Sequence, residues 1–185
     1  DGDISTLIER YQNNPVRHEV EGADDAPENT HVFMKVRTPD RVQVTAEIVK
    51  KEYSAIVFCR TKHGADRLAV QLEGLGVSAT AIHGDRTQKQ RERALHLFSS
   101  GKVQCLVATD VAARGIHVDN VGCVVHFDPA QDDKDYVHRS GRTGRAGTTG
   151  TVVSMLLPNH VKLGYARARR LDLEVFEEMP VFDGP

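Results

Sequence analysis

Long hydrophobic runs and paired cysteines are both missing from this sequence of 185 residues. No stretch approaches the roughly 20 consecutive apolar residues that cross a bilayer, and the first residues lack the basic and apolar regions of a secretory signal. The three cysteines, Cys59, Cys105 and Cys123, form no C-x-x-C pair, and each lies in an apolar run. We therefore expect a soluble, cytoplasmic protein whose thiols are buried and free, with neither disulfides nor a zinc site.

Two glycine-rich nucleotide-binding motifs are also missing. A nucleotide hydrolase with its own phosphate loop needs G-x-x-x-x-G-K-[ST], and the Gly-Lys pair at residues 101–102 has neither the earlier glycine nor the following hydroxyl. No G-x-G-x-x-G follows a predicted strand, which weakens a dehydrogenase interpretation. Two His-x-Asp pairs, at residues 83–85 and 126–128, have the spacing of metal ligands. Ordinary hydrogen-bonded residues are the favoured interpretation of both, so we expect no metal site.

The net charge of −2 conceals an uneven distribution. Residues 1–30 carry eight acidic residues and two arginines, a balance of −6, so residues 31–185 carry +4. Arginine outnumbers lysine by sixteen to eight. The main part of the chain is thus mildly basic, which is compatible with a local patch for a polyanion but does not by itself establish one.

The start of the chain differs in pattern from the rest. Apolar residues at helical spacing predict a short helix between Ile4 and Tyr11, which should stop at the Asn-Asn-Pro of residues 13–15. Residues 19–30 are acidic, contain Gly and Pro and have little to bury, as linkers do. The expected divisions are the tail of a preceding domain with a linker (1–30), a main domain (31–171) and a C-terminal extension (172–185).

From residue 31 onward, short β-branched runs alternate with amphipathic segments of about a dozen residues. The predicted strands cover 31–37, 54–59, 77–82, 103–108, 122–127 and 151–157. The predicted helices cover 40–52, the segment from Ala65 to Leu72, the segment opened by Thr87, and 159–171. Thr87 is followed three residues later by Gln90, which is the spacing of a capping box.

The strands are apolar throughout and are separated by helices, which indicates burial on both faces and parallel pairing. We therefore predict an α/β fold: a three-layer sandwich with a mainly parallel sheet and helices on both faces. In such sheets ligands collect at the carboxyl ends of the strands. The residues that follow each predicted strand are therefore the ones to inspect.

Polar residues follow four of the predicted strands. They are Arg60-Thr61-Lys62, His83 to Arg86, Thr109-Asp110 and Asp128-Pro129. Any one of them is more simply explained as the cap of the next helix. Four at one edge of a sheet, next to helix N-termini and basic side chains, favour a site for phosphate groups.

Three arginines recur at every third residue near the end of the main domain: Arg139, Arg142 and Arg145. No acidic residue lies between Asp135 and Asp172 to neutralise them. A purely structural role needs carboxylate partners, which the neighbouring sequence does not offer and which only the tertiary structure can supply. The favoured interpretation is anion binding, because guanidinium groups make bidentate contacts to phosphate oxygens, including the charge that develops in phosphoryl transfer.

Five segments contain most of these residues: IVFCRTK (56–62), HGDRTQKQR (83–91), ATDVAARGI (108–116), FDP (127–129) and YVHRSGRTGRAG (136–147). In this order they resemble the motifs of the second RecA-like domain of DEAD-box ATP-dependent RNA helicases. The resemblance covers roughly residues 16–171, and the last two segments are its most specific part. It implies a RecA-like fold and an N-terminal RecA-like domain in the same chain, which would hold most of the ATP and Mg²⁺.

The resemblance also implies roles for individual residues. They are Arg142 and Arg145 as catalytic arginine fingers; Gly115, His117 and Asp128 near ATP; Thr61, Gly84, Asp85, Arg86 and Thr109 on the RNA backbone; and Asp110, His138 and Arg139 in a network between the two domains. This assignment implies sequence-independent, salt-dependent RNA binding. A fragment with only this domain should be nearly inactive.

One position departs from the family, which has an aspartate that holds the ATP ribose where this chain has His117. A neutral imidazole can accept a ribose hydrogen bond, but a protonated one cannot. Two alternatives belong to other classes: a non-catalytic RNA-binding or partner-docking module of the same fold, and a dinucleotide-binding oxidoreductase. The pair of arginines argues against the first, and the missing glycine motif argues against the second.

Overall fold

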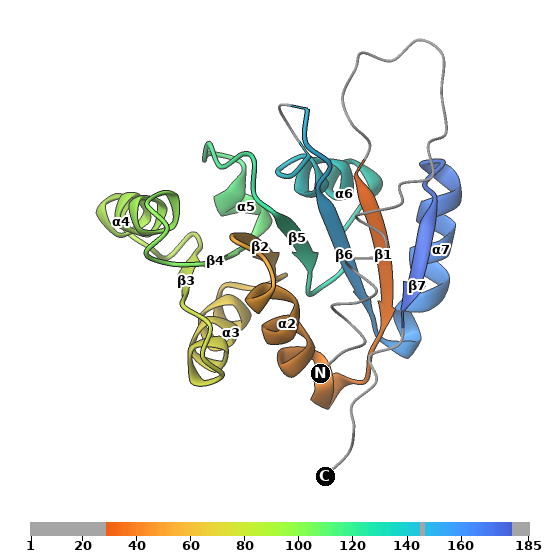
Figure 1. Cartoon of the computed structure of the whole chain (residues 1–185), viewed down its shortest axis with the longest axis horizontal. Helices are drawn as coiled ribbons and strands as arrows, with labels where there is room; N and C mark the ends of the chain where they lie inside the picture. Colours follow the sequence, from red (N-terminus) through yellow and green to blue (C-terminus); the bar gives the residue numbers. More distant parts are fainter. Residues whose placement is uncertain (1–28, 145–146, 179–185) are drawn as a thin grey trace.

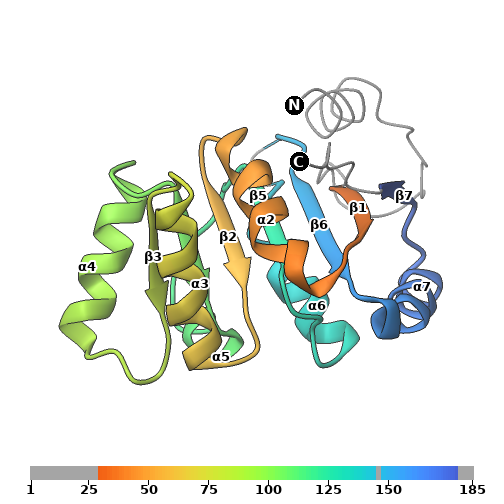
Figure 2. The same cartoon turned by 90° about the horizontal axis from the view of Figure 1, so that it is seen from below.

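A computed structural model describes residues 29–144 and 147–178 of the chain. Its centre is a seven-stranded sheet in the order β3-β4-β2-β5-β6-β1-β7, in which every neighbouring pair is parallel. The expected parallel α/β sandwich is therefore confirmed (Figures 1 and 2). The predicted helix between Ile4 and Tyr11, nearly all of the linker, and Arg145 lie outside the described residues.

All six predicted strands are present, each is shorter than predicted, and a seventh strand that was not predicted follows them. The strands are β1 (Thr30–Lys35), β2 (Ala55–Phe58), β3 (Ala79–Ile82), β4 (Cys105–Ala108), β5 (Cys123–His126), β6 (Thr151–Leu156) and β7 (Val175–Glu178). The central strands β2, β4 and β5 are buried at every residue. Continuous apolar runs therefore identified them correctly, because both faces of these strands are covered.

Helices connect the strands. They are α2 (Arg41–Lys50), α3 (Lys62–Gly74), α4 (Gln88–Ser99), α5 (Asp110–Ala113), α6 (Asp133–Ser140) and α7 (Val161–Arg170), with 3₁₀ turns at Thr38–Asp40 and Pro158–His160. The capping box of α4 forms as predicted, since Thr87 Oγ1 accepts from the Gln90 N–H and the Gln90 side chain accepts from the Thr87 N–H. Within the described ranges, every helix is too short or too polar to span a bilayer.

Alternate residues of each central strand enter two separate cores. In β2, Val57 packs with α2 and α3, whereas Ile56 and Phe58 pack with α4, α5 and α6 on the other face. A third, smaller cluster joins Phe33 and Leu156 of the sheet to α7. The helix layers thus fix the sheet from both sides and leave its carboxyl edge open to carry a site.

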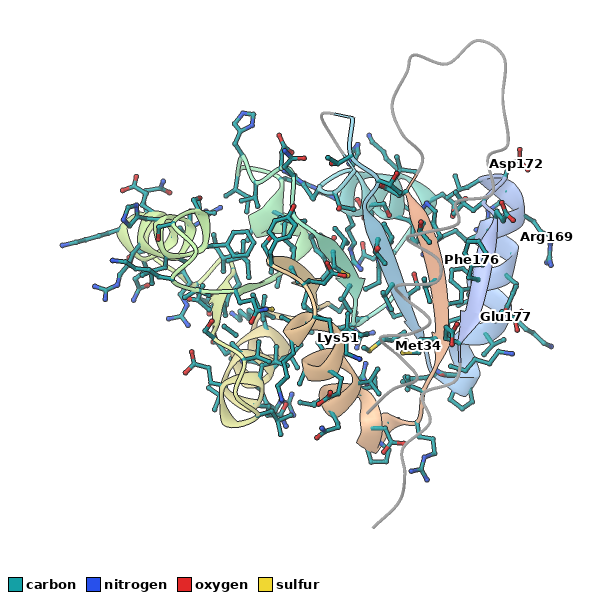
Figure 3. The ribbon with its side chains drawn as sticks, viewed as in Figure 1. Met34, Lys51, Arg169, Asp172, Phe176 and Glu177 are labelled. Atoms are coloured by element: carbon teal, nitrogen blue, oxygen red, sulfur yellow. The ribbon has the colours of Figure 1, made fainter. Side chains whose placement is uncertain are left out.

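The sheet domain continues past residue 171, where we expected it to end. Asp172, with a left-handed φ of 51°, turns the chain from α7 into β7. β7 pairs in parallel with β1 and forms an edge of the sheet, where Phe176 and Glu177 lie (Figure 3). Its sequence, VFEE, is only partly buried, so it has no apolar run that would indicate a strand.

Candidate functional site

The strand register brings the ends of four strands to one edge of the sheet. Phe58 of β2 lies opposite Ala108 of β4 and His126 of β5, and Ile82 of β3 lies opposite Ala108. The segments that follow these strands therefore start side by side. This is the arrangement that the sequence predicted for a ligand site.

A shallow depression of about 20 Å³ lies at this edge, between α5 and α6. Asp110, His138, Arg139 and Arg142 all line it. The fold thus brings together four residues that the resemblance had assigned to the ATP site and the domain interface. Of these, His138 is the most exposed, whereas Arg139 is only 2% exposed.

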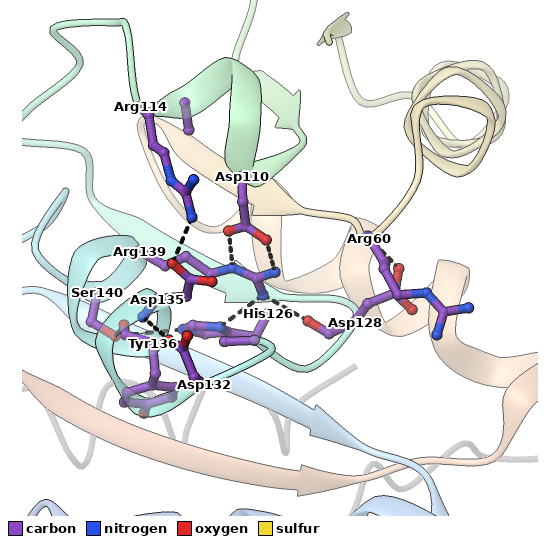
Figure 4. Close-up of polar contacts among 12 residues, drawn as sticks. Arg60, Asp110, Arg114, His126, Asp128, Asp132, Asp135, Tyr136, Arg139 and Ser140 are labelled. Carbon is purple, nitrogen blue, oxygen red and sulfur yellow. Dashed lines mark hydrogen bonds and ion pairs between the residues drawn. The ribbon is translucent and has the colours of Figure 1, made fainter. Parts of the chain in front are cut away.

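Arg139 is buried beneath the depression, where it is paired with a carboxylate (Figure 4). Its Nε and Nη2 donate to the two carboxylate oxygens of Asp110, at 2.6 and 2.7 Å. Its Nη1 donates to the backbone oxygen of Asp128 at 2.8 Å, and its guanidinium lies 5.1 Å from the ring centre of Phe58. These contacts neutralise and hold Arg139 within the domain, so only Asp110, whose side chain is 21% exposed, can present this pair to another domain.

His126 completes the contacts of Arg139. Its Nδ1 lies 3.2 Å from Arg139 Nη1, and because arginine only donates, Nδ1 must accept. The histidine ring stacks on Tyr136, with 4.6 Å between ring centres, and is fully buried. Burial and the nearby Arg139 charge hold the His126 pKa well below its usual value, so the ring stays neutral and keeps its acceptor.

Arg142 follows the end of α6 and differs from Arg139 in its partners. Its Nη1 and Nη2 donate to the backbone oxygens of Ile116 and Ala113, at 2.9 and 2.8 Å. Among the described residues no carboxylate pairs with it, and it is only partly buried. Its positive charge is therefore uncompensated locally and lies next to the exposed Gly115 and His117.

Asp128, which was assigned to the ATP site, is bound within the domain. One carboxylate oxygen accepts from Arg41 Nη1 at 3.1 Å, and the other accepts from the Arg60 N–H at 2.9 Å. Arg41 also stacks over Phe127, 4.1 Å from its ring centre. The described contacts thus give Asp128 a role in joining the ends of β2 and β5 to α2.

The residues assigned to RNA lie along the same edge of the sheet. They differ in how exposed they are and in whether their side chains already have hydrogen-bond partners. Thr61 is exposed, but its Oγ1 accepts from the Gly64 N–H at 3.0 Å and caps α3. Thr109 precedes α5, is 7% exposed and makes no side-chain capping bond. Gly84 is exposed, and a side chain there would meet no other described residue within 4 Å, so its backbone is open to a ligand.

Two charged residues of this set already have ionic partners. Asp85 lies 2.8 Å from Lys62, and the Lys62 bond is the largest cause of the lowered pKa of Asp85. Arg86 Nη2 donates to Asp66 at 2.9 Å, and the same Asp66 oxygen contacts the buried His83. The positive charge of Arg86 is therefore partly neutralised by the carboxylate of Asp66, 20 positions earlier in the chain.

The sequence did not indicate several partners of the charged residues at this edge of the sheet. Asp66 partners Arg86, and Asp135, which is 8% exposed, accepts from Arg114 Nη2 at 3.1 Å. The sequence suggests His126 only as one residue of a His-x-Asp pair with metal-ligand spacing, whereas in the structure it is a partner of Arg139. Separations of 13 to 29 positions between partners explain why no local pattern indicated these contacts.

The cysteines are buried and free, as expected. Burial is the largest cause of the raised pKa of Cys59, about 12, and it also raises the pKa values of Cys105 and Cys123. In the described part of the chain, no three His, Cys, Asp or Glu side chains gather as metal ligands. His83 and His126 instead make the protein contacts given above.

Comparison with known proteins identifies the family. The model of the family "Helicase conserved C-terminal domain" matches residues 40–147. The chain is 38% identical over 169 residues to the ATP-dependent RNA helicase DBP2 of Meyerozyma guilliermondii, covering 88% of this chain and 30% of that protein. It is also 38% identical to the ATP-dependent RNA helicase DbpA of Bacillus subtilis, covering 83% of this chain and 33% of that protein.

Solved structures show the same fold. A DEAD box protein from the hyperthermophile Methanococcus jannaschii superposes with a TM-score of 0.75 at 36% identity, over 81% of this chain and 42% of that one. The C-terminal domain of the DEAD-box protein Dbp5 superposes with a TM-score of 0.73 at 30% identity, over 84% of this chain and 91% of that one. The chain thus has the RecA-like fold of these C-terminal domains.

This chain belongs to the helicase conserved C-terminal domain family, and within it to the C-terminal RecA-like domains of DEAD-box proteins. It spans about a third of the length of the curated relatives that it matches.

Proposed function

We propose that this chain is the second motor domain of an ATP-dependent RNA helicase, in which it supplies arginine fingers to ATP and half of the RNA groove. The observation that carries the proposal is Arg142, a partly buried arginine at the ligand edge that, among the described residues, is bonded to backbone oxygens and to no carboxylate. Such a group keeps its full charge for an anion brought in by a partner domain.

The described residues around Arg142 fit a nucleotide. Gly115 is exposed, and among the described residues a side chain there would meet only the end of Arg91, so a phosphate can approach the backbone closely. In the proposal, Arg142 and Arg145 stabilise charge on the γ-phosphate, and His117 accepts from the ribose. ATP and Mg²⁺ themselves would be held mainly by the N-terminal RecA-like domain, and the metal would neutralise charge on the phosphates.

The RNA groove is proposed along the ends of β2, β3 and β4. The open backbone at Gly84 and the side chains of Thr61 and Thr109 suit contacts to sugar and phosphate, which carry no sequence information. Arg86 would add a phosphate contact at the cost of weakening its bond to Asp66. Binding should therefore be independent of base sequence and sensitive to salt.

Exposed apolar side chains support a covering domain. Val111 is 72% exposed on α5 and Val137 is 52% exposed on α6, and each is the chain neighbour of a residue that lines the depression. Apolar side chains exposed beside a charged site are suited to a surface that another domain covers. In the proposal, the N-terminal domain covers them when ATP and RNA bind, with His138 and Asp110 at the contact.

RNA-stimulated ATP hydrolysis by the full-length protein tests the proposal. We expect Arg142→Ala to lower the rate by about 10³- to 10⁵-fold, as the loss of an arginine finger does. Arg142→Gln keeps an amide donor for the Ala113 or Ile116 oxygen but has no charge, and we expect a similar loss. Arg169→Ala is the matched control, because Arg169 lies on the outer face of α7 (Figure 3).

Full activity of Arg142→Ala would refute the finger assignment. Activity retained in Arg142→Gln but lost in Arg142→Ala would reduce Arg142 to a support for the loop at residues 113–116. The 185-residue chain alone should hydrolyse ATP no faster than a buffer blank, because it lacks a phosphate loop. RNA binding without any ATP hydrolysis by the full-length protein would instead favour a non-catalytic docking module.

A further inference from the structure

A cavity of about 580 Å³ lies apart from the depression that holds Arg142. It is bounded by β1 and β6 of the sheet and by helices α6 and α7. Of the residues assigned to ATP, RNA or the domain interface, none that the structure describes lines it. Its volume is that of sites for small organic molecules, which span about 300 to 1,000 Å³.

One part of the cavity wall is apolar. Phe33 of β1, Leu156 of β6 and the ring of Tyr136 from α6 all contribute to it. Leu163 of α7 also lines the cavity and is 65% exposed, which is unusual for a leucine beside a core cluster. A ligand that covers these groups would gain the free energy of burying apolar surface.

Another part of the wall carries two arginines that share one carboxylate. Arg167 Nε and Arg170 Nη2 both donate to one Asp133 oxygen, at 3.0 and 2.9 Å, and Arg170 Nε donates to the other at 2.7 Å. Arg167 Nη2 donates to the Ala130 backbone oxygen at 2.9 Å. Within the described residues, Nη1 of each arginine has no hydrogen-bond acceptor, so two guanidinium donors remain for a ligand.

The charge around these donors favours an anion. Hydrogen bonds from Arg170 and Arg167 hold the pKa of Asp133 far below its usual range, so this carboxylate stays ionised and cancels only one of the two arginines. Lys134 and Asp132 also line the cavity, and their opposite charges add up to zero. The described residues of the wall therefore carry one unmatched positive charge beside its apolar part.

We propose that this cavity binds a small amphipathic carboxylate, whose apolar body lies against Phe33, Leu156 and Leu163 and whose carboxylate bonds to Nη1 of Arg167 and Arg170. The proposal is independent of the ATP and RNA assignments, since it uses none of their residues. A free organic acid and the last residue of a peptide share this chemistry, and the experiment separates them.

The chain contains no tryptophan, so an indole ligand can be excited at the red edge of its absorption without protein background. Fluorescence anisotropy of indole-3-acetate is titrated with the 185-residue chain. We expect a Kd of about 1 mM, the value for a ligand of this size at ordinary efficiency. Indole-3-acetamide, which has the same shape without the charge, should bind at least about tenfold more weakly.

Two neighbouring arginines of α7 give matched variants. Arg170→Gln should weaken binding of indole-3-acetate about tenfold, whereas Arg169→Gln should leave it unchanged, because Arg169 lies on the outer side of α7 (Figure 3) and does not line the cavity. Leu163→Asn should weaken both the acid and the amide. Arg170 and Leu163 are exposed, so neither variant is expected to unfold the chain.

The outcomes separate clearly. Equal affinities for acid and amide, equal effects of Arg169→Gln and Arg170→Gln, or no binding at about 10 mM ligand would each overturn the proposal. An acetylated Gly-Gly-Trp peptide with a free carboxylate, compared with its amide, identifies the source. Tighter binding of the free peptide than of indole-3-acetate supports a peptide terminus, and binding of indole-3-acetate alone supports a free acid.

Discussion

The guanidinium of Arg139 and the carboxylate of Asp110 face each other through two hydrogen bonds of 2.6 and 2.7 Å, and Arg139 is 2% exposed. The pair joins the last turn of α6 to the first residue of α5. A buried ion pair adds little stability over an apolar replacement, but removing one partner leaves an uncompensated charge. The pair therefore makes the α5 and α6 ends of the site dependent on each other.

Asp110→Ala should destabilise the chain by about 3 to 5 kcal/mol, because Arg139 would keep its charge without a carboxylate in a buried position. Urea unfolding followed by circular dichroism gives the free energy. Asp133→Ala is the matched control, since both aspartates are the first residue of a helix and both bind arginine. Its loss should be clearly smaller, because its partners Arg167 and Arg170 are 14% and 56% exposed, so water can solvate them, whereas Arg139 is 2% exposed. Equal losses in the two variants would contradict a special cost at Asp110.

The free energy of unfolding should fall as the pH is lowered, and His31 should cause part of this loss. Burial lowers the His31 pKa from 6.5 to about 4, and its Nδ1 lies 2.7 Å from the Tyr136 hydroxyl. Between these two pKa values the unfolded chain binds the extra proton, so His31 lowers the unfolding free energy as the pH falls. His126, whose pKa is also lowered, acts in the same direction.

His31→Gln keeps an acceptor for Tyr136 but does not titrate. We expect the parent to lose about 2 kcal/mol more than this variant between pH 7 and pH 5, measured as unfolding free energies at each pH. Comparison with the parent at every pH is needed because Glu52, whose pKa burial raises to about 7, has the opposite effect over this range. Parallel pH profiles for parent and variant would show that His31 has the same pKa in both states.

Releasing Arg86 from its carboxylate should strengthen RNA binding by the full-length protein. Asp66→Asn removes the charge that Arg86 contacts at 2.9 Å, so Arg86 becomes available to a phosphate. We expect tighter binding to single-stranded RNA and a slope of log Kd against log salt that is steeper by about 0.7 to 0.9. Glu47→Gln makes the same charge change on α2, away from the strand ends, and should not alter the slope. An unchanged slope in Asp66→Asn would remove Arg86 from the RNA groove.

His117→Asp should strengthen ATP use in the full-length protein. An ionised carboxylate accepts a ribose hydrogen bond more strongly than an imidazole does, and His117 is exposed, so either side chain can reach a ligand here. We expect the KM for ATP to fall about tenfold in the variant. Identical KM values in the two proteins would exclude a ribose contact at this position.

The sheet could be predicted from the sequence because its strands are buried on both faces. Strands such as Ala55–Phe58 and Cys105–Ala108 are apolar at every position, so they can be recognised without an alternation of apolar and polar residues. Once these strands are located, the residues that follow their carboxyl ends are known as well. β7 could not be predicted in this way, because an edge strand with the sequence VFEE carries too little apolar surface. The structure gave it through its pairing with β1.

The roles of the arginines could be predicted only in part. Spacing alone treats Arg139 and Arg142 alike, but α6 ends at Ser140, so Arg139 lies in the last helical turn and Arg142 lies beyond it. Arg139 meets Asp110, 29 positions away, whereas Arg142 meets backbone oxygens. A contact over such a separation depends on how α5 packs against α6. Sequence patterns within a single segment cannot predict this packing.

The three buried thiols have a practical consequence for studying movement in this protein. Cys59, Cys105 and Cys123 are inaccessible, and their raised pKa values keep them protonated and slow toward maleimides. A single cysteine placed at exposed Val137 would take up a dye selectively while the native thiols of this domain stay in place. Distance measurements by fluorescence can then follow how α6 approaches a neighbouring domain without replacing these core residues.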